Sequence, residues 1–361
     1  MNLATLRLHN QRLVGPPFAS PRETVRWLGA AQAQDYQGAK WGVALRTEGA
    51  SDASLDRAFD AGELLRLHAM RPTWHFVAPE DVRWLLALTS PRVHAANGPM
   101  YRRLELDDDV FRRAHAIFTR ALRDGRHLTR GELADALDAD GIPARGQRLA
   151  YVVMHAELEG LICSGPRQGK QHTYALLDER VPPAPALPRE EALAALAGRY
   201  FASHGPATPH DFSWWSGLTV TDARRGIESL GSAVERVEVD GTTYWTASGS
   251  LAMPGADESV VHLLPNYDEH VVAYRNHGPT VHPGAREALR GWANAALDAH
   301  LLCVDGLITG GWKRTLGKQS AELRVNPLVP LSAEHRAVLH RAADDYGRYL
   351  GLSVDVHGLE A

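Results

Sequence analysis

The chain has 361 residues, of which 44% are hydrophobic and 23% charged, and its formal net charge at neutral pH is −4. This composition predicts a globular protein of two to four folding units and excludes a uniformly basic nucleic-acid-binding chain. The two cysteines are too few for a disulfide framework or a cysteine-based zinc site, and they suit a reducing compartment. The sequence shows no secretory signal and no apolar run of about 20 residues, so we expect a cytoplasmic protein that does not contact a membrane.

Three expected helices start with a similar capping signal. Ser20-Pro21-Arg22-Glu23 and Thr129-Arg130-Gly131-Glu132 are capping boxes, and Thr208-Pro209-His210-Asp211 is a weaker third. Three such starts in similar surroundings predict a repeated structural unit.

The second copy of this unit shows the pattern most clearly. We expect helices over Val110–Arg123, over the capped segment from Leu133, and over about Gln147–Glu159. Strands near Leu161–Ser164 and Thr173–Leu177 flank a polar, glycine-rich tip. Three helices followed by two strands around such a tip are typical of a winged helix.

The other two copies follow the same order. In the third copy we expect helices over Glu190–Ser203, from Thr208 and from Thr221, with strands over Ala233–Val239 and Thr242–Ala247. In the first copy we expect helices over Ala4–Leu13, Pro21–Gln34 and Leu55–Leu65, with a wing made by Leu67–Met70 and Thr73–Val77. The proline-rich stretch Asp178–Pro188 predicts a stiff linker between the second and third copies.

The pattern turns to strands after about residue 254 and ends in a helix over Ala333–Leu350. The expected strands are Val260–Leu264, His270–Tyr274, Leu301–Val304, Leu307–Trp312 and Ala321–Val325. We therefore predict an α+β fold of three tandem winged-helix modules, residues 1–90, 91–180 and 188–250, followed by a β-rich domain, residues 255–361, with a closing helix.

The predicted modules leave more than one function open. Winged helices bind DNA, but they also serve as docking scaffolds for proteins. A non-catalytic DNA-binding protein or transcription regulator is the main alternative to an enzyme, although three unequal modules do not suit a palindromic operator. The 18 histidines show no His-x-x-x-His spacing, so we predict no metal site and no cofactor.

One residue breaks the apolar pattern of the first capped helix. On an ideal helix Gln32 would lie between Val25 and Leu28 on the buried face, with Gln34 on the opposite face. A buried amide without partners costs about 1–3 kcal/mol. Gln32 therefore either caps a neighbouring element or belongs to a functional site.

Three nearby residues have similarly open roles. Asp35 is either a helix-end residue or part of the same site. Thr73 and His75 share one face of the expected wing strand, so they either pack in the core or point into the cavity of Gln32.

Several segments, in order along nearly the whole chain, together resemble the AlkZ-type DNA glycosylase family. They are the Gln-x-Gln segment at residues 28–35, Met70–His75, Pro79-Glu80-Asp81, Leu263–His270, Gly310–Arg314 and Tyr349-Leu350-Gly351. Pro72 departs from the glycine that is frequent in the family's wing motif, so the wing shape is expected to differ.

The resemblance implies both a shape and an activity. It implies winged helices around a concave DNA channel, a barrel-like C-terminal piece, and excision of cationic N7-alkylated purines, with unhooking of interstrand crosslinks by some members. It implies that Gln32 and Gln34 are catalytic. Because an N7-alkylguanine leaves as a neutral base, amides that stabilise positive charge on the sugar would suffice.

We expect the partner to be double-stranded DNA with alkylated bases and the protein to be a monomer in the bacterial nucleoid. Basic residues at helix starts, wings and the distal motif are the candidates for phosphate contacts. They are Arg145, Arg148, Arg167, Lys170, Arg224, Arg225, Lys313 and Arg314. Asp268 and Glu269 follow a Pro-Asn turn, and we expect them to be structural rather than catalytic.

Overall fold

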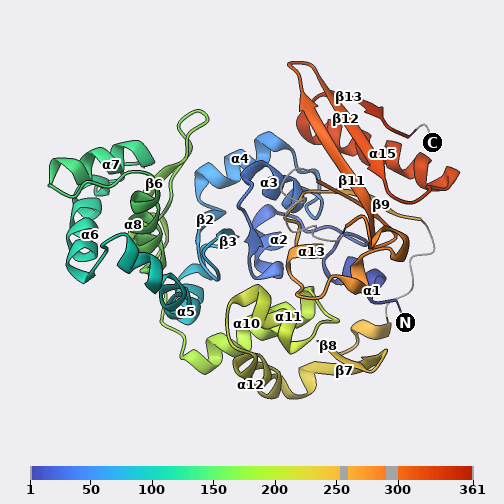
Figure 1. Ribbon diagram of the computed structural model, residues 1–361, viewed down its shortest axis with the longest axis horizontal. Helices are drawn as coiled ribbons and strands as arrows, with labels where there is room; N and C mark the ends of the chain where they lie inside the picture. Colours follow the sequence, from blue (N-terminus) through green and yellow to red (C-terminus); the bar gives the residue numbers. More distant parts are fainter. Residues whose placement is uncertain (1, 253–258, 290–299, 360–361) are drawn as a thin grey trace.

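Three stretches of the chain repeat one order of elements in the computed structural model, which describes residues 2–252, 259–289 and 300–359. The order is a helix, a short strand or bridge, two helices and two strands (Figure 1). The predicted start of the C-terminal domain at residue 255 lies outside the described residues.

The first repeat follows α1 (Leu3–Asn10) and forms a sheet of order β1-β3-β2. Its elements are α2 (Pro21–Leu28), β1 (Ala31–Gln32), α3 (Tyr36–Ala44), α4 (Asp52–Ala61), β2 (Leu65–His68) and β3 (Trp74–Val77). The predicted helix over Pro21–Gln34 is wrong beyond Leu28, because Gly29 takes a φ of +81° and ends α2. The predicted helix over Leu55–Leu65 ends at Ala61 for a similar reason, the left-handed Gly62. The sequence pattern also missed α3.

The second repeat has a sheet of order β4-β6-β5. Its elements are α6 (Asp108–Leu122), β4 (Leu128–Thr129), α7 (Arg130–Ala139), α8 (Gly146–Leu158), β5 (Ile162–Ser164) and β6 (Thr173–Leu176). It is joined to the first repeat by α5 (Val82–Arg103), a continuous helix that contains Pro91 and Pro99. The predicted boundary between residues 90 and 91 therefore falls inside a helix.

The third repeat follows α9 (Leu177–Arg180) and the proline-rich stretch. Its elements are α10 (Arg189–Ser203), α11 (Pro209–Ser216), α12 (Val220–Leu230), β7 (Val234–Val239) and β8 (Thr242–Ala247). In place of a first strand, Ala207 forms a bridge with Trp245 of β8. A short 3₁₀ turn, η1 (Gly231–Ala233), joins α12 to β7, and η2 (Ser250–Ala252) follows β8. Two more 3₁₀ turns, η3 (Gly278–Thr280) and η4 (Pro283–Ala285), lie in the C-terminal part.

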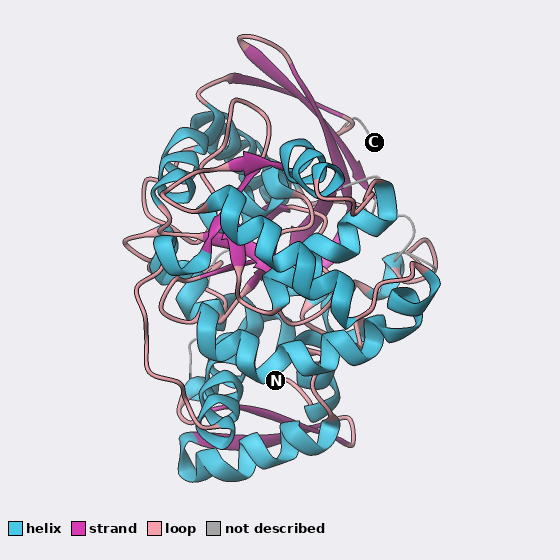
Figure 2. Cartoon of the chain, turned by 90° about the vertical axis from the view of Figure 1, so that its left-hand side faces the viewer, coloured by secondary structure: helices cyan, strands magenta, loops and turns pink. Residues whose placement is uncertain are grey.

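The C-terminal part is a five-stranded half-barrel sheet of order β13-β12-β11-β10-β9. Its elements are β9 (Val261–Leu264), α13 (Glu269–Val272), β10 (His300–Val304), β11 (Leu307–Leu316), β12 (Ser320–Pro327), α15 (Ala333–Leu350) and β13 (Ser353–His357). The predicted strand over His270–Tyr274 is wrong. Asp268 accepts a hydrogen bond from the backbone N–H of His270 and so starts α13 instead. In Figure 2 the long β11–β12 hairpin projects beyond the helices.

The first repeat lies at the centre because its residues belong to two shared cores. One core joins Val25 and Trp41 to Trp312 and Tyr346 of the C-terminal part. Another joins β2 and α5 to the third repeat. The second repeat has a core of its own, which includes Phe118. Among the described residues, no helix combines the length and apolar character needed to cross a membrane.

A buried ion pair ties the first repeat to the start of α13. Both guanidinium Nη atoms of Arg46 donate to the Asp268 carboxylate at 2.8 Å, and both side chains are 1% exposed. The remaining donors of Arg46 reach Gly42 O, Gln11 O and Gln11 Oε1. All five N–H groups are therefore paired. Burial raises the pKa of Asp268, but the charge and hydrogen bonds of Arg46 outweigh it and hold that pKa below its ordinary value.

We predict that Asp268→Asn lowers the free energy of unfolding by about 3–5 kcal/mol at pH 7, because it leaves the Arg46 charge buried without a counter-ion. Denaturant unfolding measures this loss. Asp109→Asn, which removes an exposed ion pair with Arg112, is the matched control and should cost far less. Equal losses in the two variants would contradict the role given to the buried pair.

Candidate active site

Gln32 lies on β1, directly opposite His75 of β3. The backbone N–H of Ala33 donates to Trp74 O at 2.7 Å. This bond joins the next pair of residues along the strands, so Gln32 and His75 form a pair without backbone hydrogen bonds between them, the kind in which opposite side chains are closer. The side chains of Gln32 and His75 are therefore neighbours on one face of the sheet. Both are buried, at 8% and 1% exposed.

Gln34 lies two residues beyond Gln32, outside the strand. β1 ends at Gln32, and Gln34 follows it in a bend that leads to α3. Ala33 between them is fully buried, whereas Gln34 is exposed. The end of α2 at Gly29 therefore removes both glutamines from the predicted helix, on which the two amides would point in opposite directions.

Gln32 is fixed by two charged side chains. Its backbone N–H donates to Glu269 Oε1 at 2.7 Å, and its side-chain Oε1 accepts a hydrogen bond from Arg71 Nη2 at 3.0 Å. Arg71 comes from the wing loop between β2 and β3, and its guanidinium lies 5.7 Å from the centre of the exposed Trp214 ring. Burial lowers the pKa of Arg71, and the Glu269 carboxylate opposes that shift.

Glu269 connects Gln32 to the third repeat. Its Oε2 accepts a hydrogen bond from Trp215 Nε1 at 2.9 Å and lies 3.4 Å from His204 Nε2. Only 3% of Glu269 is exposed. The sequence suggested a structural role for this residue but gave no sign that it contacts Gln32. Arg71, His204 and Trp215 were missed altogether, since only the fold brings them together.

His75 and Thr73 place buried polar atoms without hydrogen-bond partners beside Gln32. His75 Nδ1 donates to Thr73 O at 2.9 Å, which leaves Nε2 as an acceptor. Within the described part of the chain, that Nε2 and Thr73 Oγ1 are buried without a hydrogen-bond partner. Burial, assisted by the charge of Arg71, lowers the pKa of His75 to about 3, so this imidazole is neutral at physiological pH.

Asp35 lies at the edge of a neighbouring cleft of about 660 Å³. Three of the predicted phosphate-binding residues, Arg167, Lys170 and Arg314, also line it. Asp35 is half-buried at the start of α3, and its carboxylate accepts no capping hydrogen bond. The cleft is thus bounded by the first repeat, the β5–β6 loop of the second repeat and the C-terminal part.

The predicted phosphate-binding residues do not form one surface. Arg145 pairs with Asp135 and Asp138, and Arg148 donates to the backbone carbonyls of Leu104 and Glu105. Arg167 pairs with Asp56, and Arg314 donates to the Tyr346 hydroxyl. Lys170, Lys313, Arg224 and Arg225 are exposed. The last two lie on α12, at the lower edge of Figure 1.

Comparison with known proteins identifies the family and the fold of the chain. The sequence profile of the DNA glycosylase AlkZ-like family matches residues 25–349. The chain belongs to this family. It is 25% identical over 369 residues to an interstrand DNA cross-link repair glycosylase of Streptomyces sahachiroi, covering 93% of this chain and 94% of that protein. The solved Streptomyces sahachiroi DNA glycosylase AlkZ has the same fold, with a TM-score of 0.77, 22% identity and 98% of each chain covered.

The buried His75 predicts a pH dependence of stability. In the unfolded chain it binds a proton below about pH 6.5, whereas in the folded protein it does so only near pH 3. Between these values the unfolded state holds more protons, so stability falls as the pH is lowered, by up to about 1.4 kcal/mol per pH unit.

We therefore predict that His75→Asn loses less stability than the parent between pH 7 and pH 5, as measured by urea unfolding at each pH. His357→Asn, at an exposed position of β13, is the control and should follow the parent. Identical slopes for the parent and His75→Asn would show that His75 does not carry this dependence.

Proposed function

We propose that the protein is a DNA repair glycosylase that hydrolyses the N-glycosidic bond of cationic N7-alkylated purines in double-stranded DNA. The observation that carries this proposal is the buried amide of Gln32, whose Oε1 is held by Arg71, with the exposed Gln34 two residues further along the chain. Family membership supplies the reaction class, and these side chains supply the groups suited to it.

The chemistry needs no strong acid. An N7-alkylated purine is cationic and leaves as a neutral base, so the main requirement is to stabilise positive charge that develops on the sugar. The carbonyl dipole of an amide does this when it is held in place before the reaction. Arg71 uses one lone pair of Gln32 Oε1 and orients the amide, while the second lone pair remains for a sugar cation or a water molecule.

The charges around Gln32 suit the same task. Glu269 offsets the positive charge of Arg71 close to the reacting sugar. His75 is neutral, so it adds no repulsion towards a cationic base, and its free Nε2 can accept a hydrogen bond from a water or an amino group. In this mechanism Gln32 and Gln34 position water and stabilise charge without abstracting a proton.

We further propose that the three repeats are winged-helix modules, with α4, α8 and α12 as their third helices. The repeated element order and the matching sheet orders of the first two repeats support this. We also propose interstrand crosslinks as a second substrate class. The Streptomyces sahachiroi relative is named for their repair, and the cleft that begins at Asp35 offers room for a bulky adduct.

A single assay tests the central proposal. The protein is incubated with a duplex that contains one N7-methylguanine, and heating in alkali then converts each abasic site into a strand break. We expect breaks at the lesion only. Tight binding without breaks would favour a non-catalytic DNA-binding protein.

We predict that Gln32→Ala reduces single-turnover excision by roughly 10²–10³-fold, the effect of removing one preorganised dipole elsewhere. DNA affinity should change little, because phosphate contacts dominate binding. Gln34→Ala should lose less, since this side chain is exposed, and Gln34→Asp should stay active because a carboxylate also stabilises positive charge.

The control is Gln147→Ala, which removes an exposed glutamine of α8. The melting temperature and the excision rate are measured on the same preparations. If Gln32 were only a structural amide, Gln32→Ala would melt earlier while its folded fraction excised normally. Normal excision by a folded Gln32→Ala protein would contradict the catalytic role proposed for Gln32.

We predict that DNA binding is salt-sensitive and rests on local cations. Lys170→Ala and Arg225→Ala should each weaken binding to all sequences alike and reduce the salt slope by about 1. Arg112→Ala, on α6, is the control and should bind as the parent does. A loss confined to one DNA sequence would show that the residue contacts bases, and no loss would remove it from the interface.

A further inference from the structure

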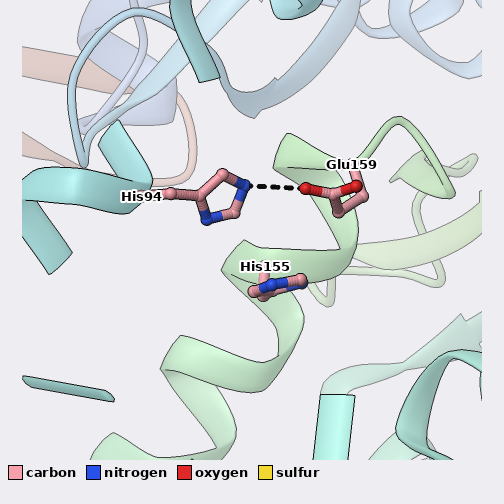
Figure 3. Close-up of side chains that lie close together, drawn as sticks. All are labelled: His94, His155 and Glu159. Atoms are coloured by element: carbon pink, nitrogen blue, oxygen red, sulfur yellow. Dashed lines mark ion pairs between the residues drawn. The ribbon is translucent and has the colours of Figure 1, made fainter. Parts of the chain in front are cut away.

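Three potential metal ligands meet where α5 packs against α8. His94 extends from α5, while His155 and Glu159 extend from successive turns at the end of α8 (Figure 3). One ligand atom from each lies within 4.8 Å of the other two. The sequence predicted no metal site because His94 lies on a different helix, far from the other two in the chain.

Each imidazole is already oriented by a second partner through its Nδ1 atom. His94 Nδ1 lies 2.9 Å from the Tyr101 hydroxyl, and His155 Nδ1 lies 3.2 Å from His115 Nε2. The Nε2 atom of each ring is left for a ligand. Metal-binding histidines are usually held in this way, with the second ring nitrogen hydrogen-bonded to a neighbouring group.

The third ligand is already close to the first. His94 Nε2 lies 3.0 Å from Glu159 Oε1 (Figure 3). Two ligands on a tetrahedral ion, each about 2.0–2.1 Å from it, are separated by roughly 3.3 Å. His94 and Glu159 therefore have nearly this spacing, and the ligand atom of His155, within 4.8 Å of both, would approach them when an ion binds.

The site can be reached from the surface, because Glu159 is exposed and His94 and His155 are only half-buried. A cavity of about 440 Å³ is lined by His94 and Glu159 and gives an ion a route to the site.

We propose that His94, His155 and Glu159 bind a divalent transition-metal ion of the zinc type, with water as the fourth ligand. Two imidazoles and a carboxylate form a ligand set that suits such an ion. The site lies at the junction of two cores: Trp84 and Leu85 of α5 belong to the core shared with the first and third repeats, and α8 belongs to that of the second. A bound ion would therefore fasten the second repeat to the rest of the protein.

The test uses the full chain without an affinity tag, treated with chelator and then titrated with ZnCl₂ by calorimetry. We expect saturable binding of one equivalent with a dissociation constant below about 10 µM and a rise in melting temperature, since the ion binds the folded state. Titration with CoCl₂ should give visible absorption bands of a four-coordinate ion, which report the geometry directly.

Two ligand variants and two matched controls decide the assignment. Glu159→Gln and His94→Gln should each weaken zinc binding at least about tenfold, whereas Glu228→Gln and His340→Gln, both at exposed helix positions, should bind zinc as the parent does. Glu159→Gln alters an exposed side chain, so this variant should fold and excise normally. A loss of zinc binding by this variant therefore cannot be attributed to unfolding. No saturable binding by the parent up to about 100 µM, or undiminished binding by both ligand variants, would overturn the proposal.

Discussion

The buried ion pair between Arg46 and Asp268 is the interaction on which the candidate site depends. Asp268 both accepts from Arg46 and starts α13, so the pair fixes the position and direction of this one-turn helix. The next residue, Glu269, then reaches the backbone of Gln32 on one side and Trp215 on the other. A two-residue strand has too few hydrogen bonds to hold the proposed catalytic amide by itself. The C-terminal part therefore acts as the support of an amide that the first repeat supplies.

The same network explains how the site could accept the cationic substrate that we propose although it contains an arginine. Arg71 orients Gln32, but in a buried setting its charge would repel both a cationic base and a positive sugar. Glu269 lies close enough to oppose that charge, and desolvation keeps His75 neutral. The hydrogen bond from Arg71 to Gln32 can therefore position the amide without the repulsion that an unpaired charge would exert. Arg71 orients the amide of Gln32, and the carboxylate of Glu269 balances the charge of Arg71.

Features that depend on local sequence rules were predicted from the sequence. Features that depend on contacts between distant segments were missed. The helices that start at Pro21, Arg130 and Pro209, and the helix over Ala333–Leu350, lie where capping and periodicity placed them. β1 was missed because two residues are too few for a pattern, and Gly29 permits either a helix end or a helix interior until its φ is known. The prolines of α5 concealed a continuous helix. Gln32 was recognised as out of place on an apolar face, but its partners Arg71 and Glu269 come from other elements, which no local pattern connects.

Apolar cores hold some junctions between the parts of the protein more firmly than others. This difference decides which junction controls access to the cleft beside Asp35. The first repeat shares apolar cores with the third repeat and with the C-terminal part, so shifting either would disrupt a core. The second repeat has its own core, but Cys163 of β5 also belongs to the core shared with the third repeat, and α5 and α8 share a small apolar cluster. Its β5–β6 loop differs, because Arg167 holds this loop to the first repeat through an ion pair with Asp56. A displacement of the loop breaks this polar contact without opening one of the described cores. Because the loop lines the cleft, the width of the cleft depends on this polar contact, whereas Gln32 lies at junctions that buried contacts hold.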